Sequence, residues 1–154
     1  MTASELSAFI TIFRRNREEF YITLFPRIPN PALREHLQSA VQPWLNDIAI
    51  DLPPDSISNV LELKPINSMI LQDIIKKEGS GRMVGRMVIS YEDAINLAMQ
   101  LEEAGLLFFE EIERLVGDRI SSVCDVVEQH RQALGALQTL QDAVRYRKLD
   151  LGGV

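Results

Sequence analysis

The sequence predicts an all-α protein: a four-helix bundle made of two antiparallel helical pairs joined by a long crossover. Apolar residues recur at helical spacing in long segments, and helix start signals precede several of these segments. The one β-like run, at 84–90, is short and has no second run to pair with. We expect one domain over 1–150, with helical pairs at 2–50 and 90–146, a crossover at 51–89 that contains a short helix, and a flexible tail at 147–154.

Capping residues and prolines delimit the first helical pair. Thr2 and Glu5 have the spacing of a capping box, and Pro26 ends the helix that follows them. Asn30, which precedes a proline, is a favourable N-cap for the second helix. Pro43 lies within the apolar pattern of that helix, so we expect a kink there.

The second helical pair has similar signals. Ser90 and Asp93 have the spacing of another capping box, and the helix that they start extends to about Gly117. A turn at 117–118 leads into a last helix, which runs from about Arg119 to about Tyr146. The two helices are therefore expected to be antiparallel neighbours.

Composition and charge limit the classes of function. A formal net charge of -6 and an isoelectric point near 4.9 repel nucleic acids and anionic membranes. No segment has the roughly 20 consecutive apolar residues that a bilayer span requires, and the first residues do not resemble a signal peptide. The single cysteine excludes an intramolecular disulfide, which is typical of a reducing compartment. We expect a soluble cytoplasmic protein with neither nucleic acid nor membrane as a partner.

Each helix of the second pair has one ionisable residue in its apolar stripe. The stripes are Ile95, Ala98, Glu102, Gly105, Phe109, Ile112 and Val116, and Ile120, Val123, Val127, His130, Leu134 and Leu137. At a rise of roughly 1.5 Å per residue, Glu102 lies roughly 22 Å before the turn and His130 roughly 18 Å beyond it, so the two side chains are at similar depth. A buried, ionised glutamate is unfavourable unless it gains a metal, a cation or a hydrogen-bond partner.

The run YEDAINLAMQLEEAGLLFFEEI, at 91–112, resembles the first ligand helix of rubrerythrin-like members of the ferritin-like superfamily. In those proteins a glutamate is followed by a small residue and, seven positions on, by an aromatic residue, as in Glu102, Gly105 and Phe109. The resemblance implies a ferritin-like bundle whose next helix carries a Glu-x-x-His motif that binds two irons. His130 fits this motif, but Val127 occupies the position of its glutamate. The ligand set of a di-iron centre is thus degenerate.

The first helical pair departs further from the family pattern, because alignment of its aromatic residues places Arg14 at the position that corresponds to Glu102. The apolar stripe of the first helix instead places Arg17 on the inward side. Either arginine would bring a guanidinium to Glu102, which gives a buried polar cluster of Glu102, His130 and an arginine in a metal-free bundle. Two alternatives stay open: Glu102 and His130 bind a metal, or Glu102 reaches solvent at the edge of the stripe.

These observations predict a non-catalytic ferritin-like helical protein that has lost an intact di-iron centre, needs no cofactor and acts as a dimerising or partner-binding module. The apolar run Leu106, Leu107 and Phe108 needs cover outside the stripe, which favours a homodimer. The alternative is a metal-binding oxidoreductase or iron-handling protein. Its iron or manganese would be held by Glu102 and His130 from each of two chains.

Overall fold

The computed structural model describes residues 3–46, 48–50, 52, 88–116 and 120–146, and four α-helices account for most of them. The helices are α1 (Ala3–Leu24), α2 (Pro31–Val41), α4 (Tyr91–Val116) and α5 (Ser121–Arg145), and two short 3-10 helices, η1 (Phe25–Arg27) and η2 (Gln42–Trp44), follow α1 and α2. The described residues contain no β-strand, which confirms the all-α prediction for this part of the chain. The predicted capping box at Thr2, the short helix of the crossover, the turn after α4 and the tail lie outside the described residues.

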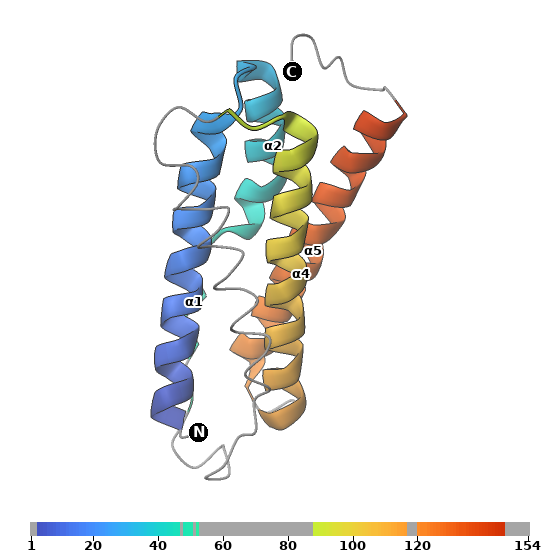
Figure 1. Ribbon diagram of the computed structural model, residues 1–154. Coiled ribbons are helices and arrows are strands. Elements are labelled where there is room, and N and C mark those ends of the chain that lie inside the picture. The colour runs from blue at the N-terminus through green and yellow to red at the C-terminus, as the bar shows by residue number, and fades with distance from the viewer. Residues whose placement is uncertain (1–2, 47, 51, 53–87, 117–119, 147–154) are drawn as a thin grey trace.

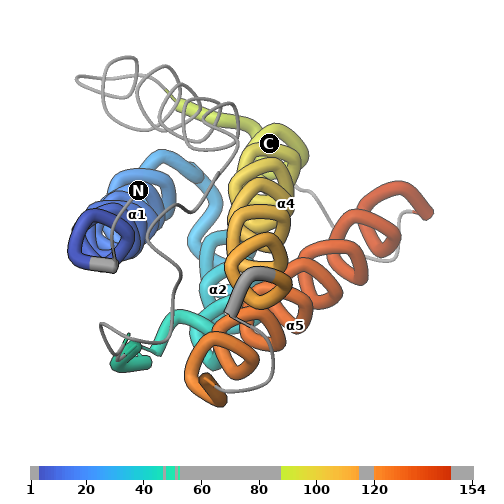
Figure 2. Tube along the Cα trace, turned by 90° about the horizontal axis from the view of Figure 1, so that it is seen from below, coloured from blue at the N-terminus to red at the C-terminus, as the bar shows by residue number. Residues whose placement is uncertain are grey.

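The four helices lie side by side, with α4 between α1 and α5 (Figures 1 and 2). In Figure 1, α1 and α5 run upward, whereas α2 and α4 run downward. The start of α4 is held beside the end of α1 by a backbone hydrogen bond from Ile89 N to Arg27 O of 3.0 Å. α1 and α4 are therefore antiparallel neighbours, although residues 25–90 separate them along the chain.

Two of the predicted helix starts have the expected caps. The Asn30 side chain accepts hydrogen bonds from the backbone of Ala32 at 2.9 Å and of Leu33 at 3.3 Å, as an N-cap does. The Ser90 hydroxyl accepts from the backbone N–H of Asp93 at 3.1 Å. These bonds satisfy amides that the first turn of a helix leaves without partners.

The second helix is shorter than the sequence predicts. The α-helix ends at Val41, and Pro43 lies within η2 instead of kinking a longer helix. Proline lacks a backbone N–H, and its ring collides with the carbonyl group four residues before it, so the helical hydrogen bonds stop there. The described residues from Leu45 to Leu52 have no helical structure. One corner of the bundle is thus half helix and half irregular chain.

Side chains from α1 and α5 hold this irregular segment in place. Three alternate backbone carbonyls accept hydrogen bonds: Trp44 O from Arg17 Nη2 at 3.1 Å, Asn46 O from Gln129 Nε2 at 2.7 Å, and Ile48 O from Arg14 Nη1. A chain outside regular secondary structure has no backbone partners for such groups, so buried side chains must supply them. Arginine and glutamine here replace the hydrogen bonds of the missing helical turns.

All four helices contribute to the hydrophobic core. The largest fully buried side chains of this core are Tyr21, Tyr91, Phe20, Phe109, Leu6, Leu24, Ile28, Leu33, Leu37, Ile95 and Leu101. The predicted stripes of α4 and α5 face inward, except that Leu134 is only half-buried, and the side chain of Val116 lies outside the described set. None of the helices in the described part of the chain has the length and apolar character of a membrane span.

Candidate functional site

The structure brings Glu102 and His130 together in the middle of the core, with Arg17 and Tyr21 beside them. Glu102 Oε1 accepts hydrogen bonds from Arg17 Nε at 2.9 Å and from the Tyr21 hydroxyl at 2.7 Å. Glu102 Oε2 accepts from Arg17 Nη2 at 3.0 Å and lies 2.7 Å from His130 Nδ1. A carboxylate has about four lone-pair sites, two on each oxygen. All four sites of Glu102 are therefore occupied by protein groups.

Helix geometry explains how these side chains meet. Arg17 and Tyr21 are four residues apart on α1, so they lie on the same face of that helix, one turn apart. Glu102 comes from the middle of α4 and His130 from the middle of α5, at matching depth in an antiparallel pair. We call Arg17, Tyr21, Glu102 and His130 the polar cluster, and it links three helices across the core.

The protonation states follow from burial and from the neighbouring charges. Burial alone raises the pKa of Glu102, but the charge of Arg17 and the hydrogen bond from His130 outweigh this effect and lower the pKa from 4.5 to about 2. Burial lowers the pKa of His130, and the charges of Arg17 and Arg14 lower it further, although Glu102 opposes the change. Burial and the charge of Glu102 raise the pKa of Tyr21 well above its ordinary value.

At neutral pH the polar cluster thus contains an ionised Glu102, a charged Arg17, a neutral His130 and a neutral Tyr21. Because an ionised carboxylate can only accept hydrogen bonds, the proton of the neutral imidazole lies on Nδ1 of His130. One negative and one positive charge remain, and they face each other in a two-bond contact. The polar cluster is therefore neutral as a whole, as a buried group must be in an apolar core.

Aromatic rings and one glycine enclose the imidazole. The ring of Phe109 stacks on His130 with centroids 5.3 Å apart, and Phe13 meets its edge at 5.8 Å. A Cβ atom at Gly105 would lie 2.6 Å from His130 Cε1, 2.8 Å from His130 Nδ1 and 2.9 Å from Phe13 Cζ. These distances are too short for any side chain. The absence of a side chain at Gly105 is what lets His130 reach Glu102.

The two arginines that the sequence left as alternatives have different roles. Arg17 pairs with Glu102, whereas Arg14 Nη1 donates to the carbonyl of Ile48. Glu102 has no exposed surface, so the alternative in which it reaches solvent is wrong. Tyr21 was not among the residues expected at the site. Its signal in the sequence was its position one helical turn after Arg17.

The donor set does not fit a di-iron centre. In the ranges that the structure describes, no group of three or more His, Cys, Asp or Glu side chains is placed to hold a metal ion. Val127, at the position of the bridging glutamate, is fully buried, and the neighbouring Glu128 is exposed and accepts a hydrogen bond from Gln132 at 2.7 Å. The lone pairs of Glu102 are already occupied, and a metal cation beside it would be repelled by Arg17.

Comparisons with known proteins find no family model that matches the chain, no similar curated protein and no similar solved structure. The part of the chain that the structure describes is all-helical, with four α-helices, and membership of the ferritin-like superfamily is not shown by these findings.

The close approach at Gly105 predicts the effect of a single methyl group. Gly105→Ala is expected to lower the free energy of unfolding by about 1–3 kcal/mol, because the methyl group displaces the ring of His130 or of Phe13. Urea denaturation followed by circular dichroism measures this change.

Gly135 provides the matched control on α5. It is exposed, and a Cβ atom there would meet no other atom within 4 Å. Gly135→Ala is expected to raise the free energy of unfolding by about 0.5–1 kcal/mol, the usual gain for alanine in an open helical position. If both alanine variants were stabilised equally, His130 would not lie against Gly105.

Proposed function

We propose that this chain is a non-catalytic ferritin-like helical protein in which the ion pair of Arg17 and Glu102 takes the place of a di-iron centre, and that it acts as a dimerising or partner-binding module. One observation carries the proposal: both oxygens of Glu102 already accept two hydrogen bonds each. A carboxylate in this state has no lone pair to give to a metal ion or to a proton of a substrate.

Opening the polar cluster for a metal ion would be costly. The ion would have to replace at least two of the four hydrogen bonds to Glu102 and would add positive charge beside Arg17. Arg17 is itself buried and also donates to the carbonyl of Trp44, so moving it away from Glu102 would break that hydrogen bond as well. The same groups that stabilise the ionised Glu102 therefore oppose metal binding.

The ferritin-like part of the proposal rests on helix directions and on one small residue. α1 and α2 run in opposite directions, as do α4 and α5, while α2 and α4 run the same way and are joined by a long connection (Figure 1). Two antiparallel pairs with one long crossover are the arrangement of ferritin-like bundles. Gly105 also occupies the position of the small residue in the family pattern, and here it leaves room for the histidine of the next helix.

The proposal predicts that metals leave the protein unchanged. Protein purified from iron-supplemented cells is expected to contain far less than one iron or manganese per chain, and adding either ion should not change its melting temperature. Glu102→Gln should lower the free energy of unfolding by about 1–3 kcal/mol, with or without metal, because it weakens the charge-assisted hydrogen bonds. Elemental analysis and thermal melts give these values.

Glu103→Gln is the matched control, because Glu103 is the exposed neighbour of Glu102 on the same helix. It should melt like the wild type. Stoichiometric iron or manganese in the wild type that is lost in Glu102→Gln and kept in Glu103→Gln would favour the alternative, a metal-binding protein with ligands from two chains.

Dimerisation is the second part of the proposal, and we expect Leu107 of α4 to contribute to the interface. Of the run that suggested it, Phe108 stacks on Phe13 of its own chain, Leu106 is half-buried, and only Leu107 is largely exposed. Light scattering at high micromolar concentration is expected to give twice the 17.5 kDa mass of one chain.

Leu107→Glu should shift that mass toward the monomer, because a charge at an apolar contact must be desolvated. Gln138→Glu, at an exposed position of α5, adds the same charge and should leave the dimer intact. A wild-type protein that stays monomeric at every concentration would contradict this part of the proposal.

A further inference from the structure

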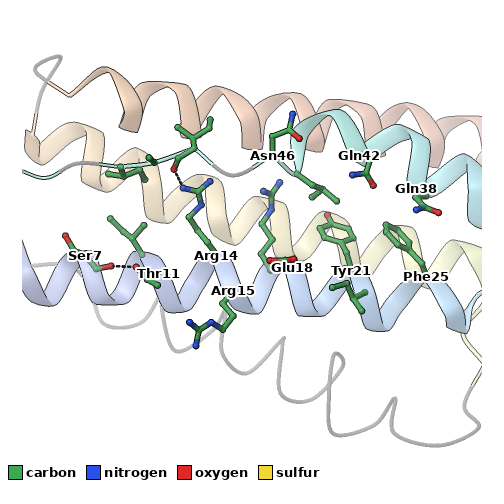
Figure 3. A pocket seen from close by; sticks show the side chains of 17 residues that line it. Ser7, Thr11, Arg14, Arg15, Glu18, Tyr21, Phe25, Gln38, Gln42 and Asn46 are labelled. Carbon is green, nitrogen blue, oxygen red and sulfur yellow. Dashed lines mark hydrogen bonds between the residues drawn. The ribbon is translucent and has the colours of Figure 1, made fainter.

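A cavity of about 800 Å³ lies between α1 and the chain around and after the end of α2 (Figure 3). It is bounded on one side by α1 and on the other by the end of α2, η2 and the irregular residues up to Ile50. The cavity lies where α2 ends early, at Val41, and irregular chain takes the place of the expected helical turns. The volume is within the range of roughly 300–1,000 Å³ that small-molecule sites have.

The walls of the cavity combine apolar and polar groups. Apolar surface comes from both sides and includes Ile10, Phe25, Leu45, Ile48 and Ile50. Three amide side chains, Gln38, Gln42 and Asn46, follow one another at four-residue intervals along the α2 side, across from Tyr21 of α1 and Phe25 of η1 (Figure 3). Such a mixture of apolar surface and a few convergent polar groups is typical of sites for amphipathic small molecules.

The charge of the lining is unequal. Among the described residues of the lining, Arg14, Arg15 and Arg17 are positive and Glu18 is negative, while Glu102, behind the lining, compensates the charge of Arg17. This excess contrasts with the net charge of -6 of the whole chain. Positive groups that gather in one cavity of an acidic protein raise the local potential and favour an anionic ligand over a cationic one.

The cavity also reaches the polar cluster, because Arg17 and Tyr21 belong to both. Arg17 uses Nε and Nη2 for Glu102 and Trp44, and no hydrogen bond from its Nη1 is found within the described residues. A guanidinium held in place on one side by a carboxylate is preorganised to donate to a second oxygen acceptor on the other. Arg17 therefore lies between the polar cluster and the cavity, with its guanidinium held in place by Glu102.

We propose that this cavity binds a small amphipathic carboxylate, with its head group at the level of Arg17 and its apolar body against the aliphatic and aromatic walls. A body of roughly eight to ten carbon atoms is small enough for this volume. This site goes beyond the proposed function and does not depend on it, because the ligand contacts groups of the cavity and leaves the bonds of Glu102 in place.

Isothermal titration calorimetry with three probes of equal length tests the proposal: decanoate, decylammonium and decanol, each below its micelle concentration. Decanoate is expected to bind at one molecule per chain, and decylammonium at least roughly tenfold more weakly, because charge complementarity distinguishes the two head groups. Decanol should fall between them. No binding of decanoate, or equal binding of decanoate and decylammonium, would overturn the proposal.

Two matched pairs of variants locate the site. Gln42→Trp fills the cavity from an exposed position on η2, whereas Gln138→Trp places the same ring on the exposed surface of α5. Arg15→Glu reverses a charge in the lining, and Arg131→Glu makes the same change on α5. The first member of each pair should weaken decanoate binding by roughly tenfold or more, and the second should not. Equal effects within a pair would show that decanoate binds elsewhere.

The decanoate titration and the metal experiment test different groups, so one can fail without the other. Metal content and melting temperatures report on Glu102, whereas decanoate binding reports on the cavity wall. A protein that binds iron and also binds decanoate would refute the proposed function and support the cavity site. A metal-free protein that does not bind decanoate would agree with the proposed function and overturn the cavity site. The wild-type probe series decides the matter even if a tryptophan variant fails to fold.

Discussion

The buried ion pair of Arg17 and Glu102 is the constraint on which the rest of the structure depends. An ionised carboxylate without exposed surface is tolerated only because a guanidinium, a phenol and an imidazole donate to it. The desolvation of both charges offsets much of their attraction, so replacing both members of such a pair by apolar groups is often neutral. The pair therefore contributes more to the alignment of α1 against α4 than to net stability.

Several distant features follow from this pair. Gly105 is needed because His130 must approach Glu102 through the space that a side chain would occupy. Arg17 also binds the carbonyl of Trp44, which ties the end of α2 to α1 at the level of the polar cluster. The same arginine forms part of the cavity lining, so one side chain joins the core, the irregular segment and the candidate ligand site.

The helices and the approach of Glu102 to His130 were predictable from the sequence, because both depend on regular spacing. Helical rise sets the depth of a residue in an antiparallel pair, and periodicity sets the face on which it lies. The partner of Glu102 on α1 was harder to predict. Arg14 and Arg17 are three residues apart, and periodicity alone does not show which of two long side chains reaches the carboxylate.

The cavity was not predictable from the sequence. It depends on how Pro43 changes the end of α2, and the pattern was compatible with a kinked helix that continued to about residue 50. Once the helix ends, the chain has no period, and its position depends on hydrogen bonds from Arg14, Arg17 and Gln129, which are distant in sequence. Contacts between residues so far apart in the chain leave no signal in the local sequence pattern.

The pH dependence of stability tests the central claim most directly, since it reports whether Glu102 is ionised in the core. The pKa of Glu102 is about 2 in the folded protein and 4.5 ordinarily, so its contribution is present above pH 4.5 and is lost as the pH falls toward 2. At pH 3, which is 1.5 units below 4.5, the loss at roughly 1.4 kcal/mol per unit is about 2 kcal/mol. Urea denaturation at pH 7 and pH 3 should show that the wild type and Glu103→Gln lose about 2 kcal/mol more than Glu102→Gln does. The same loss in all three proteins would contradict a buried, ionised Glu102.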